Sequence, residues 1–175
     1  MNNLSYRDVV QKELTIVGKP TIIKVFKRIF ISTGERCVFL YRIGGILKNK
    51  GYRILSILIH NYLIKNFGIF LSYKAQIGIG LKLPHPNGII IGNGSIIGEN
   101  CTIFHQVTLG GKKVGDAKEN NYPCVGNNVT IFSGAKLFGS IKIGDNCIIG
   151  ANSVVNKSFS NDSTIIGSPG KKIVK

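Results

Sequence analysis

The sequence contains no tryptophan, one methionine, and only 8 acidic residues against 23 basic ones. Charged residues make up 18% of the chain and hydrophobic residues 43%, a balance too apolar for a disordered protein. A chain of 175 residues is long enough for one domain, or for one domain with a helical cap. The composition therefore indicates a compact, basic protein.

The shortage of acids leaves a formal net charge of +15, with the higher density of positive charge in the first 70 residues. Such a surface favours an anionic partner, namely a membrane surface, a phosphorylated substrate or nucleic acid. No zinc finger or RNA-recognition signature accompanies the charge, so we expect no nucleic-acid partner. A basic surface that only keeps the protein soluble is the alternative.

Paired cysteine motifs are also missing. The four cysteines show no CxxC spacing and no nearby histidine pair, so a metal site is not expected: Cys37, Cys101, Cys124 and Cys147. The first residues do not have the pattern of a signal peptide, and the cysteines are expected to be reduced thiols of a cytoplasmic protein.

Residues 1–70 contain no apolar run long enough to span a membrane, but mix apolar and basic residues at helical spacing. We expect amphipathic helices in 21–31, 36–48 and 52–70, broken by Gly34, Gly44, Gly45 and Gly51. Arg53, His60 and Lys65 interrupt the last segment too often for a transmembrane span. The helices either pack on their own protein, with His60 as a packing residue, or lie peripherally on the inner face of the membrane.

From residue 71 to 170 the pattern has a period of six. Aliphatic residues recur at this spacing, and the fourth residue after most of them is small: the aliphatic positions are Ile91, Ile97, Ile103, Leu109, Val125, Ile131, Leu137, Ile143, Ile149 and Val155. Six-residue repeats are typical of a parallel β-helix, in which each repeat contributes one short strand and one corner. The sequence therefore predicts a mainly β protein, a parallel β-helix with an N-terminal α-helical cap and a basic tail at 171–175.

Two insertions interrupt the repeat. Two extra residues fall in the stretch LPHPNGIIIG at 83–92, which predicts a bulge that carries His85. Ten extra residues fall between Leu109 and Val125 and predict a polar loop at 110–124. Long loops on a rigid solenoid are common sites of function.

Three repeats complete one turn of a triangular coil, so residues 18 apart lie about 4.8 Å apart on the same face. Counting with the insertions places five outward positions in one column: His85, His105, Ser133, Ala151 and Pro169, with Lys171 and Lys172 after the last. The column therefore has imidazoles at one end, small residues along its middle and lysines at the other end. This arrangement suits a ligand with a thin arm and a phosphorylated tail, as in coenzyme A. The alternative is that small residues recur there only because corners require them.

Three segments give the chain a resemblance to a known family: LPHPNGIIIG, IIGENCTIFHQVTLGG, and VGNNVTIFSGAKLFGSIKIGDNCIIGANSVV with GSPGKKIV. Over residues 71–170 the chain resembles the serine acetyltransferase branch of the hexapeptide-repeat acyltransferases. The resemblance implies a left-handed β-helix and a homotrimer that binds acetyl-CoA between subunits. The N-terminal part of this chain is shorter and more basic than the helical domain of serine acetyltransferases. In this it is similar to acetyltransferases of bacterial surface polysaccharide pathways.

The resemblance also implies roles for individual residues. His85 matches the general base, and imidazole, with an ordinary pKa of about 6.5, suits that role near neutral pH. An amide of Gly110 or Gly111 is expected to stabilise the oxyanion. The coenzyme contacts of the family correspond to Gly111, Ser133 and Ala151.

Four positions depart from the family. Pro84 stands where the family has an acid before the histidine, Asn121 and Tyr122 replace an Arg-His pair in the loop, and Phe70 replaces the aspartate that orients the base. Because the first three positions recognise the charged groups of serine, we expect a sugar hydroxyl of a surface polysaccharide precursor as the acceptor, bound by Asn121, Tyr122 and His105. Serine O-acetylation and a non-catalytic trimeric scaffold are the alternatives.

Overall fold

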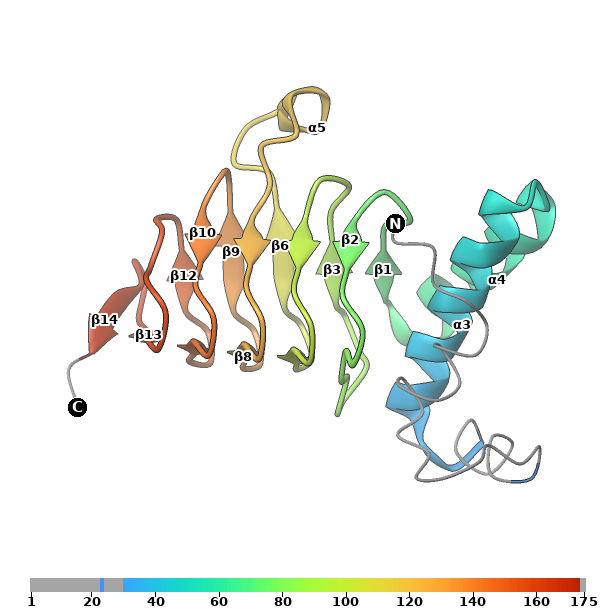
Figure 1. Ribbon diagram of the computed structural model, residues 1–175, viewed down its shortest axis with the longest axis horizontal. Coiled ribbons are helices and arrows are strands. Elements are labelled where there is room, and N and C mark those ends of the chain that lie inside the picture. The colour runs from blue at the N-terminus through green and yellow to red at the C-terminus, as the bar shows by residue number, and fades with distance from the viewer. Residues whose placement is uncertain (1–22, 24–29, 174–175) are drawn as a thin grey trace.

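Short parallel strands stacked in coils form most of the molecule (Figure 1). The structure is a computed structural model that describes Ile23 and residues 30–173. The strands are β1 (Phe70–Leu71), β2 (Gln76–Ile77), β3 (Ile90–Ile91), β4 (Ile96–Ile97), β5 (Thr102–Ile103), β6 (Thr108–Gly110), β7 (Cys124–Val125), β8 (Thr130–Ile131), β9 (Lys136–Phe138), β10 (Lys142–Ile143), β11 (Ile148–Ile149), β12 (Val154–Val155), β13 (Thr164–Ile166) and β14 (Lys171–Ile173).

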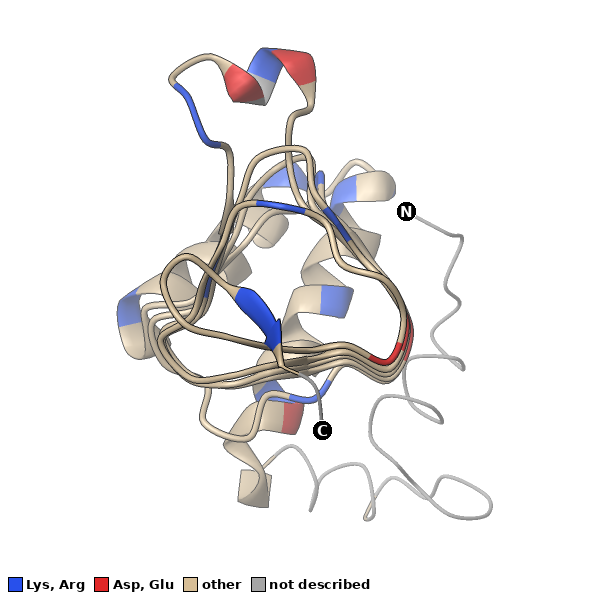
Figure 2. Ribbon diagram, turned by 90° about the vertical axis from the view of Figure 1, so that its left-hand side faces the viewer, with Lys and Arg blue, Asp and Glu red and all other residues tan. Residues whose placement is uncertain are grey.

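The strands form three sheets, one on each side of a triangular coil (Figure 2). The first sheet has the order β1-β3-β6-β9-β12, the second β10-β7-β4-β2, and the third β14-β13-β11-β8-β5. Apart from β13 and β14, successive strands of the chain belong to different sheets, so each corner of the triangle joins two sheets. Each strand pairs in parallel with the strand one coil away, as the sequence predicts, except at the C-terminal end.

The six-residue repeat fills the interior of the coil. All ten aliphatic positions predicted to point inward are buried, and so are the small residues of each repeat, including Ser95, Cys101 and Ser153. Burial raises the pKa of the Cys101 thiol, which accords with a packing role for this residue. Each coil thus contributes one layer of aliphatic side chains to a continuous core.

Strand registers locate both insertions. Phe70 pairs with Ile90, a step of 20 residues, whereas Ile90 pairs with Thr108, a step of 18, so the bulge lies between the first two coils. Thr108 pairs with Lys136, a step of 28, which places the ten-residue loop before β7. Both insertions therefore occupy corners and leave the strands aligned.

The last coil differs from the sequence expectation. Ile148 pairs with Thr164, a step of 16 rather than 18, because the chain cuts one corner short. Ile149 pairs with Ile165 and the amide of Gly150 donates to the Ile165 carbonyl, so the same step of 16 leads from Ala151 to Gly167 and not to Pro169. The prediction for Pro169 is therefore wrong.

Two helices cover the N-terminal end of the coil: α3 (Thr33–Asn49) and α4 (Arg53–Phe67). The Ser32 side chain caps α3 by accepting from the amide of Glu35, and Gly68, with φ of 61°, ends α4. These helices confirm two of the three expected segments, while the segment at 21–31 lies largely outside the described residues. No helix within the described part of the chain is long and apolar enough to cross a membrane.

The expectation that Gly34, Gly44 and Gly45 break a helix is wrong, because all three lie inside α3. A Cβ on Gly34 would come within 2.1 Å of the Leu83 carbonyl oxygen, and one on Gly44 within 1.9 Å of the Tyr73 hydroxyl. Glycine at these two positions allows close packing of α3 on the first coil.

Buried polar groups fasten α3 to the β-helix. The guanidinium of Arg42 donates to the carbonyl oxygens of Ile77 at 2.7 Å and Gly78 at 2.5 Å. The hydroxyl of Tyr41 donates to the Ser72 carbonyl at 3.1 Å. These bonds satisfy carbonyl groups at the open end of the coil, which α3 would otherwise bury without partners.

Candidate functional site

His85 lies in the bulge at the corner between the third sheet and the first. Before the bulge, Lys82 pairs with Thr102, and after it the amide of Gln106 donates to the Asn87 carbonyl. Proline on each side restricts the backbone at His85, and the amide of Asn87 donates to the His85 carbonyl at 2.9 Å. The imidazole is exposed and can reach a substrate.

Rings of the next coil flank the imidazole of His85. Its ring centroid lies 5.9 Å from that of His105, edge-on, and 6.1 Å from that of Phe104. Phe104 in turn stacks on Phe132 at 5.1 Å. The structure therefore brings the two predicted histidines together, and sequence reasoning missed the aromatic pair beside them, although Phe104 directly precedes His105.

His105 is half-buried, and its Nδ1 atom is buried without a hydrogen-bond partner in the described chain. The position at the edge of the His85 ring keeps His105 a candidate contact for the acceptor.

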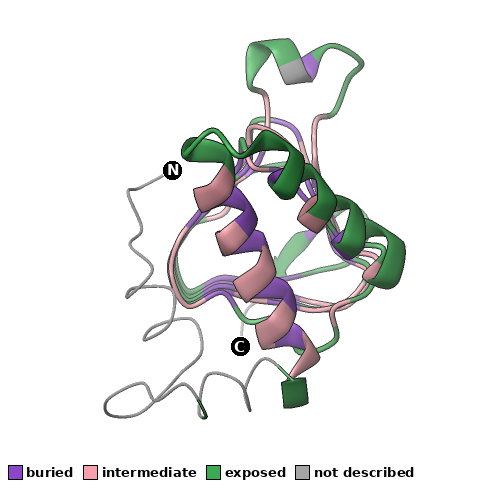
Figure 3. Cartoon of the chain, turned by 90° about the vertical axis from the view of Figure 1, so that its right-hand side faces the viewer, coloured by how far each residue is buried: buried purple, intermediate pink, exposed green. Residues whose placement is uncertain are grey.

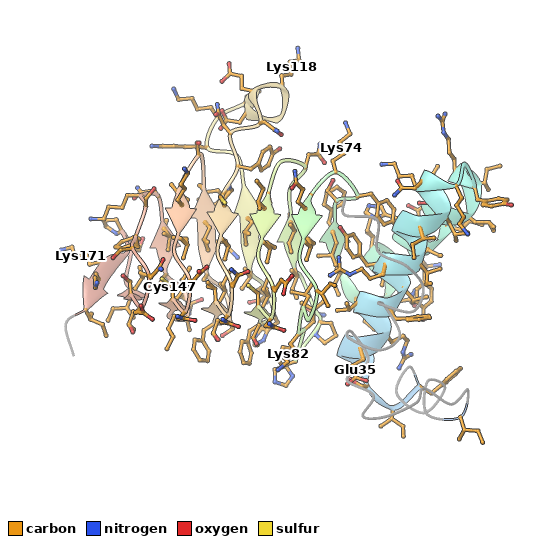
Figure 4. All side chains as sticks on the ribbon, viewed as in Figure 1. Glu35, Lys74, Lys82, Lys118, Cys147 and Lys171 are labelled. Atoms are coloured by element: carbon orange, nitrogen blue, oxygen red, sulfur yellow. The ribbon has the colours of Figure 1, made fainter. Side chains whose placement is uncertain are left out.

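The column below the histidines continues as the sequence predicts as far as the fourth position. The amide of Gly134 donates to the His105 carbonyl, and the amide of Asn152 donates to the Ser133 carbonyl. Ser133 is half-buried and Ala151 is exposed, so small side chains form the outer surface along this corner. Lys171 and Lys172 are exposed on β14 at the end of the stack (Figure 4).

The loop at 110–124 is organised by Asp116, a residue that the sequence reasoning missed. Its carboxylate accepts from the backbone amides of Lys112 at 2.5 Å and Lys113 at 2.6 Å. The amide of Lys113 is the main cause of a lowered pKa for this carboxyl group. An aspartate directly after a glycine in a polar loop is a signal for such a turn.

The side chains predicted to bind the acceptor have partners within the loop itself. The Asn121 amide donates to the Glu119 carboxylate at 2.7 Å and to Asp116 at 3.3 Å. The ring of Tyr122 lies against Gly92, where a Cβ would come within 2.3 Å of it. Tyr122 therefore holds the end of the loop against the corner between β3 and β4.

His85 and the loop lie at different corners of the same chain. The loop, with α5 (Asp116–Glu119), projects from the corner between the first and second sheets, whereas the bulge lies between the third and the first. Figure 4 shows Lys82, next to the bulge, and Lys118, in the loop, at opposite edges of the molecule. One chain therefore does not bring His85 together with Gly110, Gly111, Asn121 or Tyr122.

Phe70 does not contact His85. Its ring lies on β1 and meets the His60 ring at 5.1 Å. Within the described residues, no hydrogen bond joins His85 to a carboxylate, and no group of three or more potential metal ligands occurs. The orientation of the His85 side chain thus rests on ring contacts and on the two prolines.

A family model described as "Bacterial transferase hexapeptide (six repeats)" matches residues 125–157. A serine acetyltransferase of Helicobacter pylori is 33% identical over 175 residues, covering 100% of this chain and 99% of that protein. One of Buchnera aphidicola is 34% identical and covers 99% of this chain and 67% of that protein.

Solved structures give the same result. The chain matches the crystal structure of the serine acetyltransferase of Neisseria gonorrhoeae with a TM-score of 0.80 and 30% identity, covering 97% of this chain and 66% of that one. A complex of the Neisseria protein with serine matches similarly, with a TM-score of 0.80. This likeness, with the parallel sheets, confirms the left-handed β-helix with a helical cap.

These matches correct the expected acceptor. The relatives are serine acetyltransferases, and one of the matching structures contains serine, so the expectation of a sugar hydroxyl and of a closest likeness to polysaccharide-pathway enzymes is wrong. That expectation depended on Pro84, Asn121 and Tyr122, and differences at single positions did not decide the family.

Proposed function

This chain belongs to the serine acetyltransferase family, and from that premise we propose that it transfers the acetyl group of acetyl-CoA to the hydroxyl of serine. Membership confirms the expectation of an acetyl-CoA-dependent acyltransferase. The chain spans 99% of its Helicobacter relative but about two thirds of the Buchnera and Neisseria relatives, so the acceptor is proposed for this chain rather than carried over from them.

One observation supports the reaction most directly: the exposed imidazole of His85 stands at the head of a corner lined by small side chains. The half-buried Ser133 and the exposed Ala151 leave room along this corner for a thin, flexible arm such as that of coenzyme A. Lys171 and Lys172, exposed at the end of the stack, would neutralise its phosphates. The residues present thus fit the cosubstrate.

In the proposed reaction His85 acts as general base. It takes the proton of the serine hydroxyl as the oxygen attacks the thioester carbonyl, so that a C–O bond forms and negative charge develops on the carbonyl oxygen. An amide of Gly110 or Gly111 would donate a hydrogen bond to that oxygen. When the C–S bond breaks, the imidazolium returns the proton to the sulfur, which gives O-acetylserine and free coenzyme A.

The site requires more than one copy of the chain. Because the bulge and the loop occupy different corners, His85 of one copy would meet the loop of a neighbouring copy in a homotrimer arranged around a threefold axis. This arrangement would bring Gly110, Gly111 and Tyr122 of the neighbour to the bulge.

The test is an assay of the purified full chain with acetyl-CoA and serine. We expect serine-dependent release of coenzyme A, detected with a thiol reagent, and formation of O-acetylserine, detected by mass spectrometry. His85→Ala is the matched control and should lose both signals. If coenzyme A release does not depend on serine, the proposed acceptor is wrong.

A further inference from the structure

A second candidate site lies where the helical cap meets the first coil. It is a pocket of about 260 Å³, lined by Lys48, Arg53, Ser56, Ile57, His60 and Tyr73. These residues come from the end of α3, from α4 and from the corner after β1, so the pocket is separate from the corner that carries His85. The proposed acetyl transfer uses none of them.

The charged residues that line this pocket are both basic. No aspartate or glutamate occurs between Glu35 and Glu99, whereas Lys48 and Arg53 are both exposed at its rim. The Lys48 ammonium lies 5.7 Å from the centroid of the Tyr73 ring, above the wall of the pocket. Two cations without a carboxylate among the lining residues attract an anion.

The start of α4 adds to this attraction. The helix begins at Arg53, and its N-cap residue Tyr52 makes no side-chain hydrogen bond to the first amides. The first turn of a helix carries partial positive charge on such amides, and negative groups are stabilised beside it. Helix start and side chains therefore favour the same kind of ligand.

Aromatic rings form an apolar wall of the pocket. The ring of His60 lies 5.1 Å from that of Phe70 and 5.3 Å from that of Tyr73, measured between ring centroids. The Tyr73 hydroxyl donates to the Ser56 carbonyl at 3.4 Å and rests on Gly44. These contacts hold the rings in place, so a ligand can pack against them at little cost in rearrangement.

We propose that this pocket binds a small anion, a phosphate or carboxylate that carries an apolar group. Lys48 and Arg53 bind the charge, Ile57 and Tyr73 contact the apolar part, and the ring of His60 lines the pocket beside them. Because α3, α4 and the first coil all contribute residues, occupancy fastens the helical cap to the β-helix.

The phosphate can come from a soluble molecule or from a lipid headgroup. α4 exposes several apolar residues on its outer side, Ile54 at 76% and Leu58 at 58% among them (Figure 3). Both sources present the same chemistry to Lys48 and Arg53, so the experiment has an arm for each.

The histidines provide a readout that is independent of acetyl transfer. The chain has only three, so the ring signals of His60 can be followed by NMR in the full-length protein while phenyl phosphate is added. We expect a saturable shift and a titration of His60 that moves to higher pH, because a bound anion favours the imidazolium and offsets the effects of burial and of Lys48, which lower its pKa. Arg53 and Tyr73 are the other ionisable groups facing this ring.

Variants test the residues. Lys48→Gln and Arg53→Gln should each weaken binding of phenyl phosphate about tenfold, as expected when one charged partner of an anion is lost. Lys50→Gln, an exposed residue outside the pocket, should leave it unchanged. Equal binding of neutral phenol, an unchanged His60 signal, or an equal loss in Lys50→Gln would overturn the proposal, whatever the outcome of the serine assay.

Vesicles of phosphatidylglycerol and phosphatidylcholine form the second arm. Together with the His60 shift, sedimentation with these vesicles that is lost in Arg53→Gln and kept in Lys50→Gln supports the site with a lipid headgroup as its ligand. Binding of phenyl phosphate without sedimentation supports the site with a soluble anion. Sedimentation that persists in both variants, without phenyl phosphate binding, refutes it.

Discussion

The two insertions into the β-helix are held in different ways. The bulge that carries His85 is fixed by prolines and by neighbouring rings, with no carboxylate among its contacts in the described chain. At the start of the loop at 110–124 the carboxylate of Asp116 accepts from two backbone amides, and at its end Tyr122 packs against Gly92. The bulge therefore presents an exposed imidazole on a restricted backbone, whereas the start of the loop depends on an ionised group.

The largest effect is expected at the bulge. His85→Ala should lower kcat about a thousandfold, within the range for loss of a general base. Thermal unfolding should change little, because the imidazole is exposed. A decrease of only a few fold in kcat, measured with acetyl-CoA and serine, would assign the proton transfer to another group.

The next effect is expected at the loop. Asp116→Ala removes the acceptor for the amides of Lys112 and Lys113, and the displaced loop should lower kcat/KM about tenfold, since small misplacements of catalytic groups are costly. Lys118→Gln, exposed in the same loop, is the matched control. Equal activities of the two variants would show that the loop keeps its shape without the carboxylate.

Asp116 also makes the loop sensitive to acid. Because its pKa is lowered in the folded chain, its stabilising effect is present above the ordinary carboxyl value of about 3.9 and is lost as the pH falls through the lower, folded value. The protection factors for hydrogen exchange of the Lys112 and Lys113 amides, which correct for the intrinsic effect of pH, should therefore fall at low pH before those of the core amides of β8. If the loop amides and the β8 amides lose protection at the same pH, the loop does not unfold separately from the core.

The corner below the bulge should show a smaller effect, confined to the cosubstrate. Ala151→Leu should raise KM for acetyl-CoA about tenfold and affect kcat less, because the added side chain occupies space along the corner. Asn156→Leu, exposed beyond β12, should leave KM unchanged. An unchanged KM in Ala151→Leu would show that the arm of coenzyme A does not bind along this corner.

The smallest effect is expected at the end of the stack. Lys171→Gln with Lys172→Gln should raise KM for acetyl-CoA about threefold, and added salt should reduce the difference, because exposed charges are screened. Lys74→Gln, an exposed lysine at the other end, is the control. Equal changes in KM in the double variant and in Lys74→Gln would show that the effect arises from net charge and not from the position of the two lysines.

The regular part of the fold could be predicted because a period of six leaves little choice of inward positions. Ile131 and Ala135 are buried as counting requires, and counting through the first insertion placed His105 next to His85. The shortened last coil could not be predicted, since nothing between Val155 and Thr164 marks a missing pair of residues. Counting therefore placed Pro169 wrongly.

The candidate site was predicted only in part. His85 could be found because it sits in an irregularity of the repeat, but the role of Asp116 depends on amides that no pattern of side chains displays. The inference from Pro84 and Asn121 to a sugar acceptor was wrong because it treated two positions as independent of the rest of the site. The glycines inside α3 were wrongly predicted to break a helix. Glycine is required there because Leu83 and Tyr73, which are distant in sequence, pack too closely for a Cβ.

The two ends of the β-helix determine whether a further strand or chain can add to the stack. At one end Arg42 occupies carbonyl groups of the first coil, and at the other β14 runs antiparallel to β13, with Thr164 opposite Ile173. An exposed parallel edge is a template for addition of another chain, and neither end offers a complete one. End-to-end addition of further coils, which would build a fibre, is therefore blocked at both ends of the described stack.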